Sequence, residues 1–242
     1  MVLAVHLYKR LMRKGRVISL LALASVPGFV YWLAGFDSDP ADQGALYSDI
    51  ITNVGYTYAI AVLILTVATL REERDGGTLP YIYMRPIPRV TLAIWSIIAG
   101  IAAALTIAVG GWLATVLATL AVGADLPMTL PGLSLFVAAA VGYAAIFVPL
   151  GYLVPRSLLV GLGYIIVIES ILAEVVTGLA QFSIWRISVS IYADLATVLG
   201  DEAIEALGSV SPGVGGGVLK LTAALVVGLI TLTLALQRRD VL

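Results

Sequence analysis

The feature that most constrains this chain is a series of long apolar runs that carry almost no charge. A helix needs about 20 apolar residues to cross the hydrocarbon core of a bilayer. Six runs reach or approach that length: Val17–Gly35, Ile51–Leu70, Val90–Val122, Leu133–Val154, Leu158–Gly178 and Val218–Leu236. Hydrophobic residues make up 60% of the 242 residues and charged residues 12%, which is more apolar surface than a chain of this size can hide from water. We therefore expect an all-α membrane protein with six transmembrane helices.

The third run is so long that its number of crossings is open. Val90–Val122 would extend roughly 50 Å as one helix, and Gly110-Gly111 within it marks either a turn or a kink. The basic residues decide between these two readings, because positive charge collects on the cytoplasmic side of a membrane. With one long, tilted or kinked helix, every basic residue except Arg186 and Lys220 falls on the same side. This arrangement predicts six spans with both termini in the cytoplasm, and we expect the plasma membrane as the location.

Two further segments have the pattern of helices that lie at a membrane surface. Residues 1–16 place apolar side chains at helical spacing beside a basic cluster, which predicts an interfacial helix on the cytoplasmic face. Residues 181–199, within an outer loop over 179–217, alternate apolar and polar positions with helical periodicity, which predicts an amphipathic outer helix. A flexible link is expected over 211–217, and Trp185 is expected to anchor at the outer interface.

The composition also excludes several kinds of site. The chain has no cysteine and a single histidine, His6, so we expect no disulfide, no metal site and no histidine-based catalytic triad. No Gly-x-x-x-x-Gly-Lys-Ser/Thr phosphate loop occurs, so the chain itself is not expected to hydrolyse ATP or to be an enzyme. Residues 1–242 then form a single transmembrane domain that binds no cofactor and no nucleic acid.

Glu169 is the ionisable residue that falls deepest inside a predicted span. It lies about 18 Å from the cytoplasmic end of that span, and a carboxylate in the hydrocarbon core is costly and suggests a pathway or a proton site. The alternative is that the span ends early and that Glu169 faces an aqueous vestibule under the outer helix. If Glu169 is functional, two alternative classes of protein are open. One is an ion-coupled secondary carrier with Glu169 as its proton site, and the other is a membrane-embedded enzyme that uses Glu169 as acid or base.

The cytoplasmic loop over 71–89 is the most informative stretch of the chain. Gly76-Gly77 breaks the preceding helix, Thr78 suits the N-cap of a short new helix, and Pro86 helps to end it. That short stretch carries a group of apolar and aromatic residues: Leu79, Tyr81, Ile82, Tyr83 and Met84. A polar turn is the simpler interpretation, but a plain connector need not expose such a surface, which suits a protein partner.

At this loop the chain resembles the permease subunits of ABC-2-type transporters. In that family the loop between the second and third spans reads approximately Glu-Arg-x-x-Gly-Thr-Leu, followed by a hydrophobic turn and then Pro-hydrophobic-x-Arg. The matching positions here are Glu73, Arg74, Gly77, Thr78, Leu79, Pro86, Ile87 and Arg89. Pro80 departs from the pattern, because an acidic residue is common at its position. The basic N-terminal helix, the six spans and the outer amphipathic segment agree with the resemblance over the rest of the chain.

The resemblance implies that this chain is the transmembrane permease subunit of an ABC transporter that works by alternating access. Because most members of the family export their substrates, export is the expected direction. Its partners would be two copies of a separate cytoplasmic ATPase subunit, which binds ATP and Mg²⁺, and a second copy of this permease or a similar one. The residues that couple to the ATPase would be Glu73, Arg74, Gly77, Thr78, Leu79, Tyr81, Ile82, Tyr83, Met84, Pro86 and Arg89.

Overall fold

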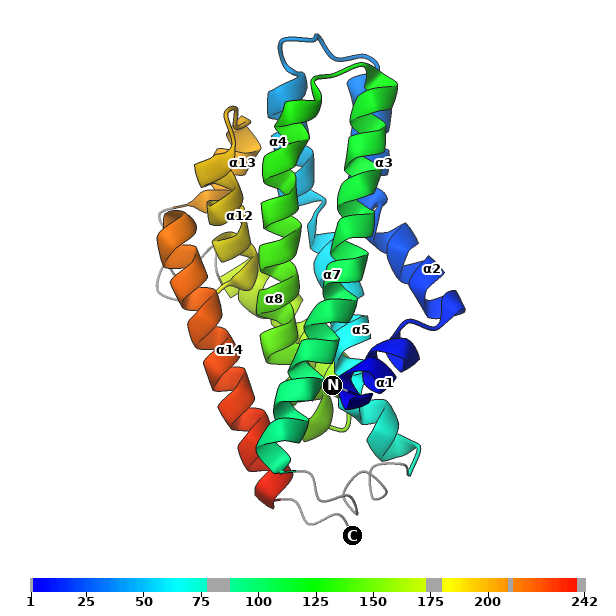
Figure 1. Cartoon of the computed structure of the whole chain (residues 1–242). Helices are drawn as coiled ribbons and strands as arrows, with labels where there is room; N and C mark the ends of the chain where they lie inside the picture. Colours follow the sequence, from blue (N-terminus) through cyan, green and yellow to red (C-terminus); the bar gives the residue numbers. More distant parts are fainter. Residues whose placement is uncertain (1, 78–87, 173–179, 209–210, 239–242) are drawn as a thin grey trace.

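The computed structural model describes residues 2–77, 88–172, 180–208 and 211–238, which form helices and short connections without a β-strand. In chain order the helices are α1 (Val2–Leu11), α2 (Lys14–Ala24), α3 (Val26–Gly35), α4 (Gln43–Asn53), α5 (Tyr56–Asp75), α7 (Arg89–Val122), the short 3₁₀ turn η1 (Leu126–Thr129), α8 (Leu130–Leu153), α9 (Ser157–Gly163), the π-helix η2 (Tyr164–Leu172), α12 (Ile184–Leu195), α13 (Asp201–Leu207) and α14 (Gly213–Arg238). Figure 1 shows an elongated bundle in which α1 and the end of α14 lie toward the end where α5 finishes and α7 begins. We call that end the base.

Within the described part of the chain, five helical stretches are long and apolar enough to cross a membrane. They are Lys14–Gly35, Gln43–Asp75, Arg89–Val122, Leu126–Leu153 and Gly213–Arg238. The prediction of an all-helical, multi-pass membrane protein is therefore confirmed. The predicted span over 158–178 corresponds to a shorter apolar stretch, Ser157–Glu169, and residues 173–179 lie outside the described part of the chain. A sixth crossing therefore stays a prediction.

The long third run forms one helix, as the charge pattern predicts. α7 continues through Gly110-Gly111 and ends at Gly123, whose φ of 80° is the left-handed conformation that glycine adopts easily. Gly110 and Gly111 therefore do not mark a turn in the chain. Glycines along α7 and its neighbours instead allow the helix backbones to approach one another closely. An ideal Cβ on Gly111 would lie 2.8 Å from the backbone oxygen of Ala24, and one on Gly28 would lie 2.7 Å from the backbone of Ala114. The pair α2–α3 therefore packs against α7 with little room between the backbones.

The first two predicted spans are interrupted where the sequence suggests continuous helices. α2 ends at Ala24 and α3 begins at Val26, because Pro27 at the start of α3 has no N–H for the preceding turn. At the break, the Leu21 carbonyl oxygen accepts both the Ser25 backbone N–H at 2.9 Å and the Ser25 hydroxyl at 2.7 Å. The second span is divided between α4 and α5 at Val54 and Gly55.

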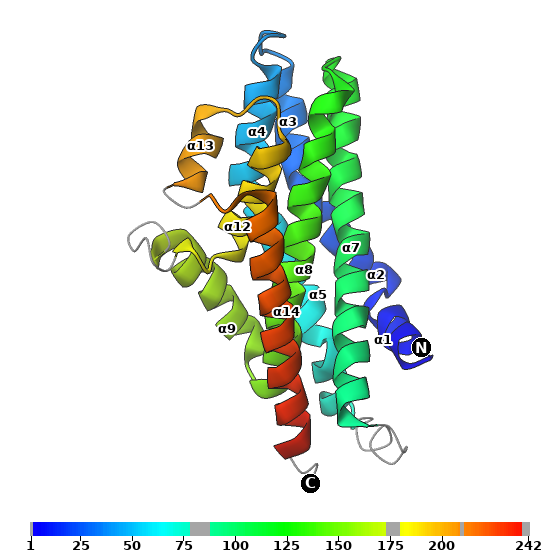
Figure 2. The ribbon, with the colours of Figure 1, turned by 60° about the vertical axis from the view of Figure 1, so that its left-hand side comes forward.

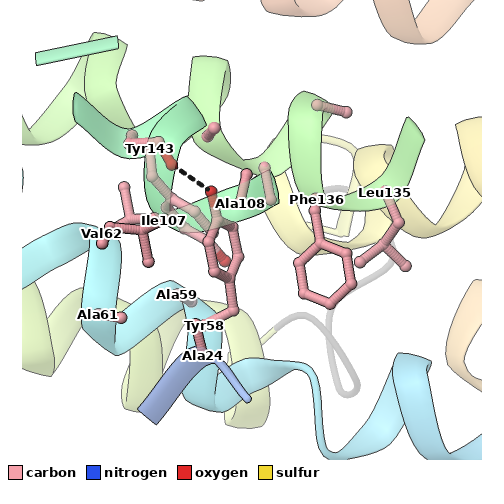
Figure 3. Close-up of a cluster of buried hydrophobic side chains, with 14 of the residues drawn as sticks. Ala24, Tyr58, Ala59, Ala61, Val62, Ile107, Ala108, Leu135, Phe136 and Tyr143 are labelled. Atoms are coloured by element: carbon pink, nitrogen blue, oxygen red, sulfur yellow. Dashed lines mark hydrogen bonds between the residues drawn. The ribbon is translucent and has the colours of Figure 1, made fainter. Parts of the chain in front are cut away.

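Helix α8 lies at the centre of the bundle and packs against α5, α7, α12 and α14 (Figures 1 and 2). Its buried side chains include Phe136 and Tyr143, which meet α5 and α7 in the aromatic and alanine-rich cluster of Figure 3. Tyr58 of α5 lies edge-on to Phe136, with ring centroids 5.1 Å apart, and its hydroxyl donates to the Ala104 carbonyl at 3.2 Å. This part of the core is thus built from small residues and aromatic rings, and the polar end of Tyr58 is paired with a backbone carbonyl.

The outer segment is more ordered than the predicted loop over 179–217. It contains α12, as the periodicity predicts, and also the short helix α13, which the sequence pattern did not indicate. The prediction of a flexible link over 211–217 is wrong, because α14 already begins at Gly213. The first N–H groups of α14 are capped by α12: Gly213 N donates to Ser190 Oγ and Val214 N donates to Asp194 Oδ2, both at 2.9 Å.

Candidate functional site

The loop that the sequence singles out begins at the end of α5, where Glu73 is almost completely buried. Its side chain is 1% exposed, and its Oε1 lies 2.6 Å from Nη1 of Arg10 in α1. The Nε2 atom of His6, one helical turn before Arg10, lies 3.6 Å from the same oxygen. A buried carboxylate needs such partners, because unpaired charge is costly away from water. Glu73 therefore joins α1 to the end of α5.

Glu72 adds a second set of contacts to the N-terminal helices. The Nη2 atom of Arg10 donates to the backbone oxygen of Glu72 at 3.0 Å, and the Glu72 carboxylate contacts both Arg10 and Arg16 of α2. These side chains are about one-quarter to one-third exposed, so each contact alone contributes little to stability. Together with Glu73 they hold α1 and α2 against the last turn of α5.

Arg74 points from α5 toward a different neighbour. Its Nη1 atom donates to the carbonyl oxygen of Tyr152 at 2.8 Å. Tyr152 lies in the last turn of α8, where backbone carbonyls lack partners within the helix and a cation is favourable. Adjacent residues of α5 thus contact α1 and α8. We call Arg10, Glu73, Arg74 and Tyr152 the base clamp.

The remaining predicted coupling residues divide into two groups. Gly77, directly after α5, has a φ of 64°, and an added Cβ would meet no atom within 4 Å. The need for glycine at this position is therefore conformational rather than steric. Arg89 is the first residue of α7, after Pro88. The others lie outside the described residues: Thr78, Leu79, Tyr81, Ile82, Tyr83, Met84 and Pro86.

Glu169 lies at the other polar centre of the bundle, within η2. Its side chain is 1% exposed, so it does not face an open vestibule. The Tyr143 hydroxyl of α8 donates to Oε2, and the backbone N–H of Ile184 donates to Oε1 at 3.0 Å.

These contacts make Glu169 a cap for the first turn of α12. Its carboxylate accepts the N–H of Ile184, while the Ser183 hydroxyl accepts the N–H of Arg186 at 3.2 Å. The first N–H groups of a helix have no partner within it and carry partial positive charge, so they stabilise an anion. Among the described residues Glu169 forms no ion pair with lysine or arginine, and the N-terminus of α12 provides the partial positive charge that stabilises its buried carboxylate.

Helix α12 contacts the break between α4 and α5 through the side chain of Trp185. Trp185 is 1% exposed, and its Nε1 donates to the backbone oxygen of Thr52 at 2.9 Å. Its ring packs on Tyr56 with centroids 4.8 Å apart. A Cβ on Gly55 would overlap both the Ile51 carbonyl oxygen and the Trp185 ring. The prediction that Trp185 anchors at the membrane interface is therefore wrong, because its indole pairs with a carbonyl that the helix break releases.

Sequence reasoning missed the partners that complete both polar centres. Arg10 appeared only as part of a basic cluster, and its separation of four residues from His6 was the signal that both lie on one helix face. Nothing in the pattern indicated that this face meets Glu73, or that Tyr143 meets Glu169. Within the described residues, no group of three or more histidine, cysteine, aspartate or glutamate side chains is arranged to hold a metal ion.

Comparison with known protein families adds the remaining evidence. Residues 7–177 match the family described as ABC-2 family transporter protein, and this match covers more than two thirds of the chain. It includes the base clamp, the predicted coupling loop and Glu169. No curated protein matches the sequence at a significant level. The resemblance found at the loop is therefore confirmed: the chain belongs to the ABC-2 family of transporter proteins, as a membrane component of the kind that typically lacks the ATPase domain.

Proposed function

We propose that this chain is the permease subunit of an ATP-driven exporter, and that the base clamp transmits the movement of a cytoplasmic ATPase to the membrane helices. The observation that carries this proposal is the pairing of Glu73 with Arg10 and of Arg74 with the Tyr152 carbonyl, directly before the loop. A push on the loop would act on α5, and through the clamp on α1 and α8.

The packing of the bundle supports a transmission of this kind. α8 contacts α5, α7, α12 and α14, and α5 contacts α7 as well. A displacement at the base of α5 and α8 would therefore move most of the bundle as a body, rather than bend one helix alone. Alternating access needs such rigid-body motion between an inward-facing and an outward-facing state. Two ATPase subunits, which bind ATP and Mg²⁺, and a second permease copy would complete the transporter.

The proposed topology has six spans, with the base in the cytoplasm. The base holds the basic residues of α1 and α2 and the end of α14 at Arg238, in keeping with the accumulation of positive charge on the cytoplasmic side. The stretch Ser157–Glu169 would belong to the fifth crossing. The capped helix α12 would then lie in the outer half of the membrane.

The contacts of Glu169 favour a structural role over the carrier and enzyme alternatives. Its carboxylate oxygens accept from Tyr143 and from the first turn of α12, so neither oxygen is turned toward an open path. A proton site or general base needs access to water or substrate. We therefore propose that Glu169 positions α12 and does not take part in proton transfer.

The experiment that tests the permease proposal changes the loop and measures its partner. In the double variant Leu79→Ala, Tyr83→Ala, we expect normal insertion, poor co-purification of an ATPase subunit and loss of transport. Truncating a buried aromatic hot spot costs about 2 kcal/mol or more, which is close to a thirtyfold loss of affinity. The matched control is Leu126→Ala, Phe36→Ala at the opposite end of the bundle, where both side chains are exposed. If the native chain co-purifies with no ATPase, the proposal fails.

A further inference from the structure

An apolar groove opens on the side of the bundle between α8, α12 and α14, and the proposed transport function does not use it. Its volume is about 620 Å³, within the range of sites that bind small amphiphiles. Leu150 and Leu153 of α8 and Ala224 and Val227 of α14 line its walls, and Phe182 stands at its mouth with 73% of its surface exposed. Figure 2 shows α14 running beside α8, while α9 diverges from both.

The floor of the groove is set by a close approach of two helices. Pro149, inside α8, has no N–H to donate to the Ala145 carbonyl four residues earlier. Gly228 of α14 packs directly against that carbonyl, since a Cβ at this position would overlap its oxygen. The two helices touch at this point, and both contribute to the walls of the groove beside it.

Lys220 gives the groove a charged end. Its ammonium group donates to the backbone oxygen of Gln181 at 3.2 Å and forms no ion pair with a carboxylate of the described residues. The side chain projects from an otherwise apolar, membrane-length helix. A lysine in such a helix is costly unless an anion compensates it or its stem reaches the interface.

The length of the groove matches one layer of the bilayer. Lys220 and Thr231 mark its extent along α14, and eleven residues of helix rise about 17 Å. Half of a hydrocarbon core of about 30 Å is about 15 Å. An acyl chain that starts beside Lys220 would therefore extend along the α14 wall of the groove for about the length of one leaflet.

From these observations we propose that the groove is a binding site for an anionic phospholipid of the leaflet that contains α12. The acyl chain occupies the apolar walls, and the headgroup phosphate pairs with Lys220. This inference stands independently of the transport cycle, because it needs only the groove, the charge and the surrounding bilayer.

The test uses the absence of cysteine from the chain. Val227→Cys places a bimane label in the groove, and Val226→Cys places the same label at the same depth on a face that does not line the groove. The labelled full chain is reconstituted in vesicles that contain brominated phosphatidylglycerol or brominated phosphatidylcholine, and quenching gives the relative affinity of the two lipids at each position. At Val227 we expect about a fivefold preference for phosphatidylglycerol, the effect of one lysine near an anionic lipid. At Val226 we expect none.

Changes at Lys220 decide whether the preference comes from that residue. Lys220→Gln should abolish it at the Val227 label, whereas Lys220→Arg should retain it and show that the fold is intact. Equal quenching by the two lipids at Val227, or the same preference at Val226, would overturn the proposal. So would formation of an intermolecular disulfide by unlabelled Val227→Cys in membranes, because a second copy of the chain would then cover the groove.

Discussion

The ion pair between Arg10 and Glu73 offers a direct test of whether the base clamp holds α1 on the bundle. Arg10→Ala would remove the arginine whose Nη1 atom lies 2.6 Å from the carboxylate of Glu73, a side chain that is 1% exposed; the His6 imidazole, 3.6 Å from the same oxygen, would remain. Removing one partner of a fully buried ion pair costs about 3–5 kcal/mol. Because Arg10 is 31% exposed, water compensates part of this loss, and we expect about 2 kcal/mol.

The double variant separates the pair from the individual side chains. Glu73→Ala removes the buried charge, so adding Arg10→Ala should then cost little more. We expect a coupling energy of about 1–2 kcal/mol in the double-mutant cycle. In a chain of this size, the loss of 2 kcal/mol lowers the thermal midpoint by about 4–8 °C. Intrinsic tryptophan fluorescence of the purified full chain during heating measures these midpoints.

A matched pair on the same helix end provides the control. Arg71 and Asp75 lie one turn apart, with Nε and Oδ2 3.2 Å apart, and the Asp75 side chain is 54% exposed. Their alanine variants should each change stability by about 0.5 kcal/mol or less. If the effects of Arg10→Ala and Glu73→Ala simply add, to within about 0.5 kcal/mol, the two side chains do not act as a pair and the base clamp is not a mechanical link.

Three other changes probe the outer half of the bundle and the topology. Glu169→Gln should lower the thermal midpoint by a few degrees, because a neutral amide caps the N–H groups of α12 by about 1 kcal/mol less than a carboxylate does. Gly55→Ala should destabilise the chain strongly, since its Cβ would overlap the Trp185 ring, whereas Gly163→Ala has open space and should be tolerated. In intact cells, an impermeant thiol reagent should label single cysteines at the proposed outer positions and spare those at the base; the outer set is Asp42, Asp125 and Gly215, and the base set is Gly76 and Arg156.

Each of these three predictions can be contradicted by a specific result. An unchanged midpoint in Glu169→Gln, together with transport that gains or loses pH dependence, would return Glu169 to the role of a proton site. Equal stability of the two glycine variants would mean that Trp185 does not occupy the break between α4 and α5. Labelling at Arg156, with Gly76 spared, would contradict a single crossing by each of α7 and α8.

The features that follow from the sequence are those that depend on composition along a single segment. Whether a stretch can cross a bilayer depends on its own length and polarity, so the apolar runs predicted membrane helices. The continuity of α7 could be predicted from its apolar composition together with the distribution of basic residues along the chain. Basic residues collect on the cytoplasmic side, so they indicate on which side of the membrane a loop lies. The family could be recognised because the loop motif is contiguous in the chain.

The two polar centres required the tertiary structure, because their partners are far apart in sequence. Arg10 and Glu73 are brought together only when α1 packs against α5, and Tyr143 meets Glu169 only across the interface of α8 and η2. Hydropathy carries no information on which buried charge faces which donor. For the same reason Glu169 appeared to be an isolated carboxylate in lipid, whereas the fold places it at the first turn of α12.

The helix breaks also depend on tertiary contacts. A break in a membrane helix leaves backbone groups without partners, and it is tolerated only where a neighbour satisfies them. At Val54 and Gly55 that neighbour is Trp185, whose indole donates to the Thr52 carbonyl, and no local pattern at residue 54 predicts a tryptophan that lies far along the chain. Local composition therefore identifies the segments that are long and apolar enough to cross a membrane, whereas the packing of those segments decides where they bend and which of their polar groups are paired.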